Sequence, residues 1–211
     1  MRKKKIFAIL FCFFSLVWVR SQKLSFKDKN FEKAVVENYD SNKDGFLDKN
    51  EAQAVLQLFL VKKGISSAED LQFFPNAKMI LLDENSISSL SLKNNGQLEL
   101  FSCTQCKISV FKGESLKSLT SLYLDQNNLE SIYLKDIPKI DQLTLSLNQL
   151  KNMDVSSLKS LRRLNLEHNH IQNLDISENN NLQTLNVGGN KIKETAIKKG
   201  SANVMIFGAE P

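Results

Sequence analysis

Oxygen-bearing side chains recur at alternate positions in a twelve-residue segment near the amino end of the chain, residues 40–51. Glycine stands at the sixth position and glutamate at the twelfth, so the segment matches the spacing D-x-[DN]-x-[DN]-G-x5-E. Oxygens at this spacing surround a calcium ion, which takes six or more of them at about 2.3–2.6 Å. The predicted ligands are Asp40, Asn42, Asp44, the backbone carbonyl of Phe46, Asp48 and Glu51. A solvated turn rich in Asn and Asp is the alternative.

Helices should flank this loop. Apolar residues at 31, 35 and 39 share one face of a helix predicted for 25–39, where Ser25 with Asp28 resembles a capping box. A short helix should follow Glu51 and run directly into a first strand near residues 57–61. On these residues, the segment from about 26 to 58 resembles the EF-hand family.

The EF-hand resemblance implies a calcium ion that stabilises the fold. EF-hands usually occur in pairs, and a second loop is absent from the sequence. Lys43 and Lys49 reduce the negative charge of the loop, so we expect weak binding, on the order of 10⁻⁴–10⁻³ M, as in extracellular modules. A structural ion is therefore favoured over a calcium switch.

Two cysteines, Cys103 and Cys106, are spaced C-x-x-C. This spacing is compatible with a redox pair or half of a metal site, with a disulfide in an oxidising compartment, or with two buried structural cysteines. Burial is the favoured interpretation, because both cysteines fall on inward positions of the repeat described below. No second C-x-x-C completes a metal site.

The two histidines, His168 and His170, flank Asn169. With the adjacent Glu167 they could hold a metal ion, but exposed turn residues are the simpler interpretation. No Ser/His/Asp or Cys/His set, paired-carboxylate cleft or phosphate loop is visible. The chain is therefore predicted to lack enzymatic activity, and a calcium-dependent or thiol-dependent secreted enzyme is the alternative.

The rest of the chain repeats every 21 residues. Each copy reads L-x-x-L-x-L-x-x-N-x-L, as in LRRLNLEHNHI at 161–171 and LTSLYLDQNNL at 119–129. A fixed period predicts a solenoid in which each copy is one turn. The ninth position of the copies holds Asn85, Cys106, Asn127, Asn148, Asn169 and Asn190. A buried amide at a tight turn satisfies backbone groups, so these Asn residues are predicted to be structural.

The repeat resembles the short, 21-residue class of secreted bacterial leucine-rich repeat proteins. The segment GISSAEDLQFFPNAK, residues 64–78, resembles the opening repeat of the internalins. The predicted fold class is an α/β leucine-rich repeat solenoid. It should have seven turns, a parallel sheet of concave strands, little convex helix and a small helical EF-hand cap. Strands should centre near residues 58, 80, 101, 122, 143, 164 and 185, and residues 204–207 should form a last edge strand.

The outward positions of the concave strands are apolar in the amino-terminal half of the solenoid and polar in the other half. Large exposed apolar patches on soluble proteins usually mark a contact surface. The candidate contact residues are Phe59, Met79, Leu81, Leu100 and Tyr123. The predicted partner is a protein or a surface glycan. Cover by the chain's own helical cap or loops is the alternative.

The first 21 residues read as a secretory signal peptide. Basic residues at 2–5 precede an apolar run over 6–19 that is too short to span a bilayer comfortably, so a cleaved signal is favoured over the alternative of a retained anchor. Five of the 28 basic residues lie in this segment, so 23 basic and 23 acidic residues remain after cleavage. The balanced charge gives no reason to expect nucleic-acid binding.

The sequence thus divides into a signal peptide (1–21), an EF-hand cap (22–56) and a solenoid (57–211). We expect a secreted or periplasmic monomer, in some settings associated with the cell surface, without membrane contact after signal removal.

Overall fold

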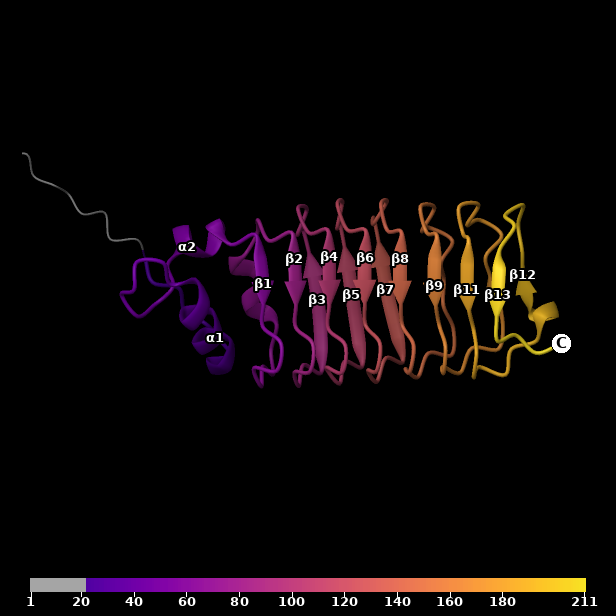
Figure 1. Cartoon of the computed structure of the whole chain (residues 1–211), viewed down its shortest axis with the longest axis horizontal. Coiled ribbons are helices and arrows are strands. Elements are labelled where there is room, and N and C mark those ends of the chain that lie inside the picture. Colours follow the sequence, from indigo (N-terminus) through magenta and orange to yellow (C-terminus); the bar gives the residue numbers. More distant parts are fainter. Residues whose placement is uncertain (1–21) are drawn as a thin grey trace, which may run out of the picture.

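The computed structural model describes residues 22–211, and the predicted signal peptide lies outside the described residues. The described part is an elongated solenoid with a helical cap at its amino end (Figure 1). Its main element, called the long sheet here, has eight parallel strands in sequence order. They are β1 (Gln57–Phe59), β2 (Met79–Leu81), β4 (Leu100–Ser102), β6 (Ser121–Tyr123), β8 (Gln142–Thr144), β9 (Arg163–Asn165), β11 (Thr184–Asn186) and β13 (Met205–Phe207).

The register of the long sheet follows the 21-residue period. Ile80 pairs with Phe101, Phe101 with Leu122, and Leu122 with Leu143. The first seven strands centre on the seven predicted positions, and β13 lies within the predicted edge strand. The predicted leucine-rich repeat solenoid is therefore confirmed.

The opposite side of the solenoid carries short strands instead of long helices, as predicted. Three of them form one parallel sheet and two form another. The first set is β3 (Ser89–Lys93), β5 (Val110–Glu114) and β7 (Ser131–Lys135), and the second is β10 (Leu174–Asp175) and β12 (Ile197–Lys198). Two short 3₁₀ helices complete this side, η1 (Glu69–Phe73) and η2 (Glu194–Ala196).

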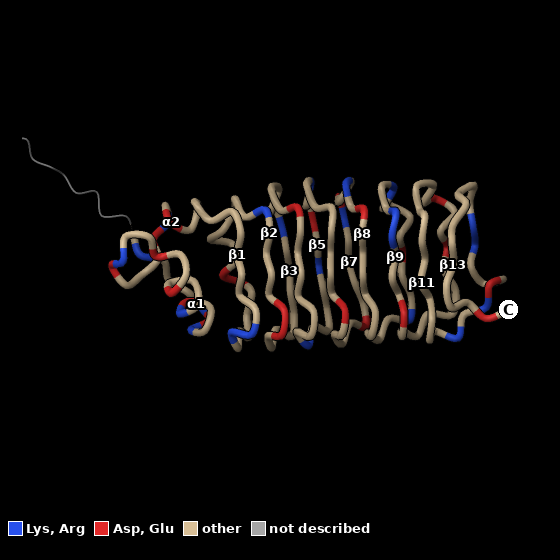
Figure 2. Tube along the Cα trace, in the orientation of Figure 1, with Lys and Arg blue, Asp and Glu red and all other residues tan. Residues whose placement is uncertain are grey.

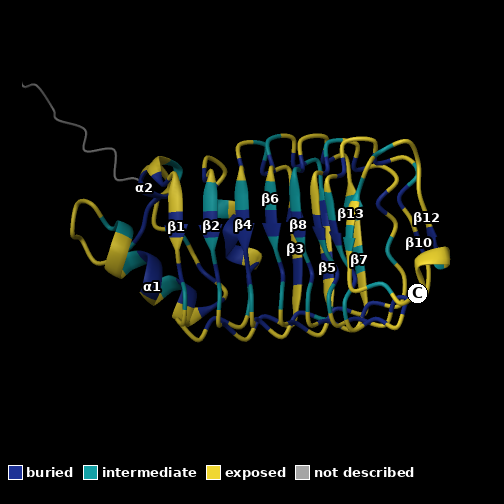
Figure 3. Ribbon diagram, turned by 45° about the vertical axis from the view of Figure 1, so that its right-hand side comes forward, coloured by how far each residue is buried: buried dark blue, intermediate teal, exposed yellow. Residues whose placement is uncertain are grey.

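The core lies between the two sides and runs the length of the molecule. The central residue of the first seven strands of the long sheet is buried while its neighbours face outward, as Figure 3 shows along β1, β2 and β4. One continuous cluster of buried apolar residues joins Phe26 in the cap to Ile197 near the last turn. The cap and the solenoid therefore share one core.

The helical cap contains α1 (Lys29–Tyr39) and α2 (Lys49–Ala54). The predicted start of the first helix at Ser25 was wrong, because Asp28 is the N-cap residue and accepts hydrogen bonds from the backbone N–H groups of Asn30 and Phe31 at 2.9 Å. The preceding Phe26 instead packs against Phe31, with ring centroids 5.9 Å apart. Because Phe26 packs against the helix in this way, the chain before Asp28 lies outside α1.

The asparagines of the ninth position form the predicted ladder. Asn127 donates from Nδ2 to the carbonyls of Cys103 and Leu124, at 2.7 and 3.0 Å, and its Oδ1 accepts from the N–H groups of Cys106 and Ile108. The residue before each ladder position has a positive φ, from 52° at His168 to 73° at Gly189. The amide thus satisfies backbone groups that this tight turn removes from the sheet.

Candidate functional site

The predicted calcium loop, residues 40–51, connects α1 to α2 and is folded by hydrogen bonds from its own backbone. Asp40 accepts from the N–H groups of Lys43 and Gly45, both at 2.8 Å. Asn42 accepts from Asp44 at 2.8 Å. Gly45 has a φ of 86°, and a Cβ added there would meet nothing within 4 Å. The sharp turn predicted at this glycine is present.

The last carboxylate of the loop lies across from its beginning. Glu51 Oε1 accepts from the N–H groups of Ser41 and Asn42, at 2.9 and 3.2 Å, and Oε2 accepts from the N–H of Asp48 at 3.1 Å. Asp48 is the N-cap residue of α2, and with Glu51 it forms a capping box. Asp48 and Glu51 are also buried, so both carboxylates already have hydrogen-bond partners away from solvent, whereas Asp44 is exposed.

The loop residues fit a calcium ion in donor chemistry and in order along the chain. All the side-chain donors are carboxylate or amide oxygens, the ligands that calcium prefers. Among residues 22–211, however, no three His, Cys, Asp or Glu side chains converge closely enough to hold a metal ion. Ion binding would require Glu51 to exchange its bonds to Ser41 and Asn42 for coordination.

Cys103 and Cys106 are joined by a disulfide in the structure, and both residues are fully buried. Both cysteines are buried as predicted, but the favoured interpretation of two unlinked structural cysteines was wrong, because the structure joins them in the disulfide that the sequence left as an alternative. Cys106 occupies a ladder position, where its Sγ lies 3.1 Å from the carbonyl oxygen of Leu82. A buried, bonded pair offers no thiolate to a substrate.

His168 and His170 are exposed turn residues, as the simpler interpretation expected. His168 Nε2 lies 3.8 Å from Glu167 Oε1. They border a cavity of about 760 Å³, together with Lys191 and Lys193 from the next turn. The sequence analysis missed these lysines as partners of the histidines, although each is 21 or 23 residues from one of them.

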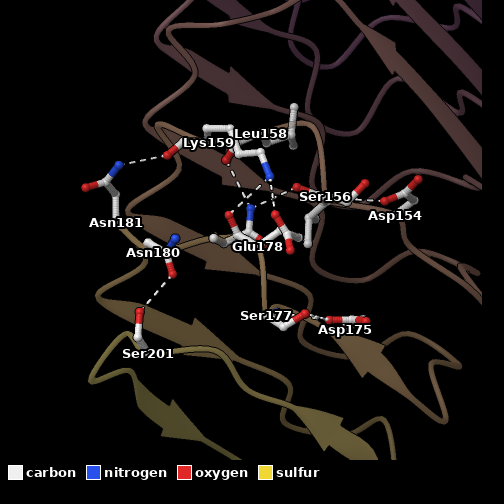
Figure 4. Close-up of polar contacts among 12 residues, drawn as sticks. Asp154, Ser156, Leu158, Lys159, Asp175, Ser177, Glu178, Asn180, Asn181 and Ser201 are labelled. Atoms are coloured by element: carbon white, nitrogen blue, oxygen red, sulfur yellow. Dashed lines mark hydrogen bonds and ion pairs between the residues drawn. The ribbon is translucent and has the colours of Figure 1, made fainter.

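A polar cluster lies on the opposite side of the solenoid, around residues 154–181 (Figure 4). Its charged groups are paired with each other or with backbone. Lys159 Nζ donates to Glu178 Oε2 at 2.7 Å, and Asp175 binds Ser177 Oγ at 2.6 Å. Hydrogen bonds from Lys198 and Ser177 hold the pKa of Asp175 well below its usual range. The cluster connects neighbouring turns through these contacts.

The outer face of the long sheet carries the predicted contact residues. Phe59 is 45% exposed, and Met79, Leu81, Leu100 and Tyr123 are partly exposed. The sheet register places Leu81 beside Phe59, and Leu100 beside Met79. Ser102 separates Leu81 from Tyr123. We call these five residues the apolar patch.

The apolar character of this face extends further than the sequence analysis proposed. Leu56, just before β1, is 52% exposed, and at the other end of the sheet Met205 and Phe207 are 60% and 53% exposed. Met205 and Phe207 continue the outward rows of Thr184 and Asn186 by one period. The 21-residue spacing could have identified them.

Charged residues are distributed along the described part of the chain. Figure 2 shows Lys and Arg interspersed with Asp and Glu from the cap to the last turn. Many pair with a residue about one turn away, such as Lys62 with Glu84 and Lys159 with Glu178. No helix in the described part of the chain has the length and apolar character needed to cross a membrane.

No protein-family model and no curated protein matches the chain. Among solved structures, an internalin (InlF) from Listeria monocytogenes is 12% identical over 85% of this chain and 91% of that one, with a TM-score of 0.35. The functional domain of InlJ from the same organism is 14% identical over 90% of this chain, which spans 62% of that chain, with a TM-score of 0.37. The Listeria internalin-like protein lmo2027 is 18% identical over 82% and 66% of the two chains, with a TM-score of 0.40.

Proposed function

We propose that this protein is a secreted, non-catalytic binding protein that recognises another protein through the outer face of its long sheet. The apolar patch is the observation that carries the proposal. Exposing several large apolar side chains on adjacent strands costs solvation free energy, at roughly 25 cal/mol per Å². A partner that covers the patch would recover this free energy.

The geometry of the patch suits a protein ligand. Its side chains project from rigid parallel strands about 4.7–4.9 Å apart, so they are pre-organised and lose little entropy on binding. The strands that follow β6 present polar residues on the same face, among them Gln142, Arg163 and Asn186, which are partly exposed or exposed. An apolar centre with a polar margin is typical of protein interfaces.

The cap does not bury the amino-terminal end of this face. The hydroxyl of Tyr39 accepts a hydrogen bond from the N–H of Phe59 at 2.9 Å, yet the Phe59 side chain remains 45% exposed. Helix α1 therefore closes the edge of β1 without covering its outward residue. This leaves the apolar patch accessible to a partner.

Photo-crosslinking at Tyr123 tests this proposal, and Tyr133 provides a matched control. Tyr133 lies in β7 on the opposite side of the molecule and is 50% exposed. We expect benzoylphenylalanine at position 123 to capture a discrete protein from extracts of neighbouring or host cell surfaces, and the same group at position 133 to capture none. Equal capture from both positions, or capture of glycan alone at position 123, would contradict the proposal.

The affinity of the captured partner gives a second measurement. Tyr123→Ala should weaken binding by about 1 kcal/mol or more and leave the melting temperature nearly unchanged, because the side chain points away from the core. Tyr133→Ala should change neither quantity. Asn127→Ala should lower the melting temperature first, since it leaves buried backbone groups unpaired. A Tyr123→Ala variant that melts as early as Asn127→Ala would show that Tyr123 is structural.

We also propose that the loop at 40–51 binds calcium and stabilises the cap. Support comes from its oxygen donors, their order and the turn at Gly45. At a calcium concentration ten times Kd, mass action would add about 1.4 kcal/mol to the free energy of unfolding. The ion would neutralise carboxylates of the loop and tie α1 to α2.

Replacing Glu51 by Gln tests calcium binding through the calcium-dependent change in melting temperature. The amide oxygen can still accept from Ser41 and Asn42, whereas the capping bond from Asp48 N–H is lost, which lowers the melting temperature with or without calcium. Because the charge is also lost, the calcium-dependent rise in melting temperature should disappear. Glu37→Gln, on the exposed side of α1, should retain it. Calorimetric titration with calcium should give the same ranking. If the melting temperature in calcium equals that in chelator for the wild-type protein as well as for Glu51→Gln, the loop is a solvated turn.

A further inference from the structure

The cavity beside His168 and His170 lies outside the apolar patch, at the turns that follow β9 and β11. Two successive repeats form its walls, residues 168–172 from one turn and 189–196 from the next. Its volume of about 760 Å³ is within the range of small-ligand sites. We call this cavity the basic pocket, lined by His168, His170, Gln172, Lys191, Lys193 and Thr195.

The side chains of the basic pocket carry nitrogen donors, and no Asp or Glu lines it. Two carboxylates adjacent in sequence to pocket residues have partners elsewhere. Glu167 accepts from Asn186 Nδ2 at 3.2 Å, and Glu194 Oε1 lies 2.6 Å from Lys199 Nζ. In the described chain, neither Lys191 nor Lys193 lies within 4.0 Å of a carboxylate oxygen, whereas Lys198 of the same repeat pairs with Asp175 at 2.8 Å. The two lysines of the pocket therefore have no carboxylate partner among the described residues, and of its basic side chains only His168 lies near one, 3.8 Å from Glu167 Oε1.

Earlier turns do not have this composition. The positions of His168, His170 and Gln172 hold Gln126, Asn128 and Glu130 two turns earlier. The shape of the basic pocket also depends on glycine at position 189, because a Cβ added there would lie 2.4 Å from His168 Nδ1. The glycine thus leaves room for the imidazole at the edge of the cavity. The basic pocket is a local feature of the last turns and does not follow from the repeat itself.

The lining favours a polar, negatively charged ligand. Apart from the imidazoles of His168 and His170, no aromatic or large apolar side chain lines the pocket, so the surface for stacking a nucleobase or packing an apolar ligand is small. Two ammonium groups suit an anionic group, and the amide of Gln172 and the hydroxyl of Thr195 suit neutral hydroxyls. A sugar bearing a carboxylate or a sulfate combines both kinds of group. We propose that the basic pocket binds an anionic saccharide.

Binding assays with four probes test this assignment by calorimetry at low ionic strength. The probes are a sulfated disaccharide or its uronic-acid analogue, the same disaccharide without anionic groups, inorganic sulfate, and an acidic hexapeptide. We expect an anionic disaccharide to bind at least about tenfold more tightly than each of the others. Binding should weaken as salt is added, because the contact is largely electrostatic.

Charge reversal locates the site. Lys191→Glu/Lys193→Glu should weaken binding of the anionic disaccharide by about tenfold or more, and Lys191→Gln/Lys193→Gln by less. Lys112→Glu/Lys139→Glu changes the net charge equally at exposed positions elsewhere and should leave the affinity within about twofold. Equal loss in the control, tighter binding of the acidic peptide, equal binding of inorganic sulfate, or no binding of any anionic disaccharide would overturn the proposal.

Discussion

At the scale of single residues, the role of an asparagine in this molecule depends on which row of the repeat it occupies. Asn148 is a ladder residue whose Nδ2 donates to Leu124 and Leu145 and whose Oδ1 accepts from Leu129 N–H. Asn179 is equally buried but belongs to another row, in which the preceding turns hold Leu116, Ile137 and Leu158. Its Nδ2 donates to two carbonyls, while its Oδ1 has no partner among residues 22–211.

This difference predicts opposite outcomes for the same substitution. Asn148→Leu should lower the free energy of unfolding by about 2 kcal/mol or more, because it leaves buried backbone groups unpaired. Asn179→Leu removes an unpaired oxygen and adds apolar contact, and the carbonyls of Val155 and Leu158 keep bonds from Leu158 and Leu161 N–H. Its stability should stay within about 1 kcal/mol of wild type or rise. Chemical denaturation of both variants measures the contrast, and similar large losses would refute it.

At the scale of elements, Asp28 joins the cap to the solenoid. Its Oδ1 starts α1, and its Oδ2 accepts from the N–H groups of Ser66 and Ser67 at 2.7 and 3.0 Å. Burial alone would raise the pKa of Asp28, but these hydrogen bonds outweigh it and the pKa lies below its ordinary value. One carboxylate thus couples two elements that are 38 residues apart.

The lowered pKa of Asp28 makes the attachment sensitive to acid. A carboxylate with a depressed folded-state pKa contributes stability above its unfolded value of about 3.9, and this contribution is lost as pH falls through the folded value. Asp28→Asn should therefore reduce stability at pH 7 and flatten its decline below about pH 4. Glu37→Gln, on the exposed side of α1, provides the control. Denaturation curves from pH 7 to 3 measure the free energy of unfolding of the wild-type protein and of Asp28→Asn. A parallel decline in the two proteins would contradict this role of Asp28.

The sequence predicted those elements whose signal is periodic. Strand centres such as Ile80 and Leu143 follow from apolar residues 21 apart, and the ladder follows from Asn at a fixed position. The start of α1 was misplaced because Asp28 is selected by contacts with Ser66, which local spacing does not reveal. The disulfide stayed open, since the C-x-x-C spacing also fits two separate buried cysteines. The basic pocket was missed because its residues depart from the repeat.

At the scale of the whole molecule, the described turns differ in how firmly their two sides are paired. Between β3 and β7, each turn contributes a strand to both sheets. The turn after β8 contributes no strand to the side opposite the long sheet. The last pair of strands on that side, β10 with β12, has only two residues per strand. Stability should therefore be distributed unevenly along one continuous core.

Hydrogen exchange should reveal this gradient. Amides of β5 and β7, such as those of Phe111 and Ile132, should exchange more slowly than those of β10 and β12, because opening the end turns breaks fewer interactions. A single cooperative transition is still expected on heating, since the core is continuous from the cap to the last turn. Uniform protection along the chain, or separate melting of the cap, would contradict this description.

The ladder bonds connect residues 19 to 25 positions apart, or within one turn, so each repeat carries the donors and acceptors that its neighbours need. An in-frame duplication of a unit such as 140–160 in the gene would reproduce every partner in register, and the protein could lengthen without a new fold. The unit that contains Cys106 is the exception, because its copy would supply a sulfur where the adjacent turn requires an amide. Descendants of this chain that grow by duplication should therefore copy the asparagine-bearing units and leave that one single.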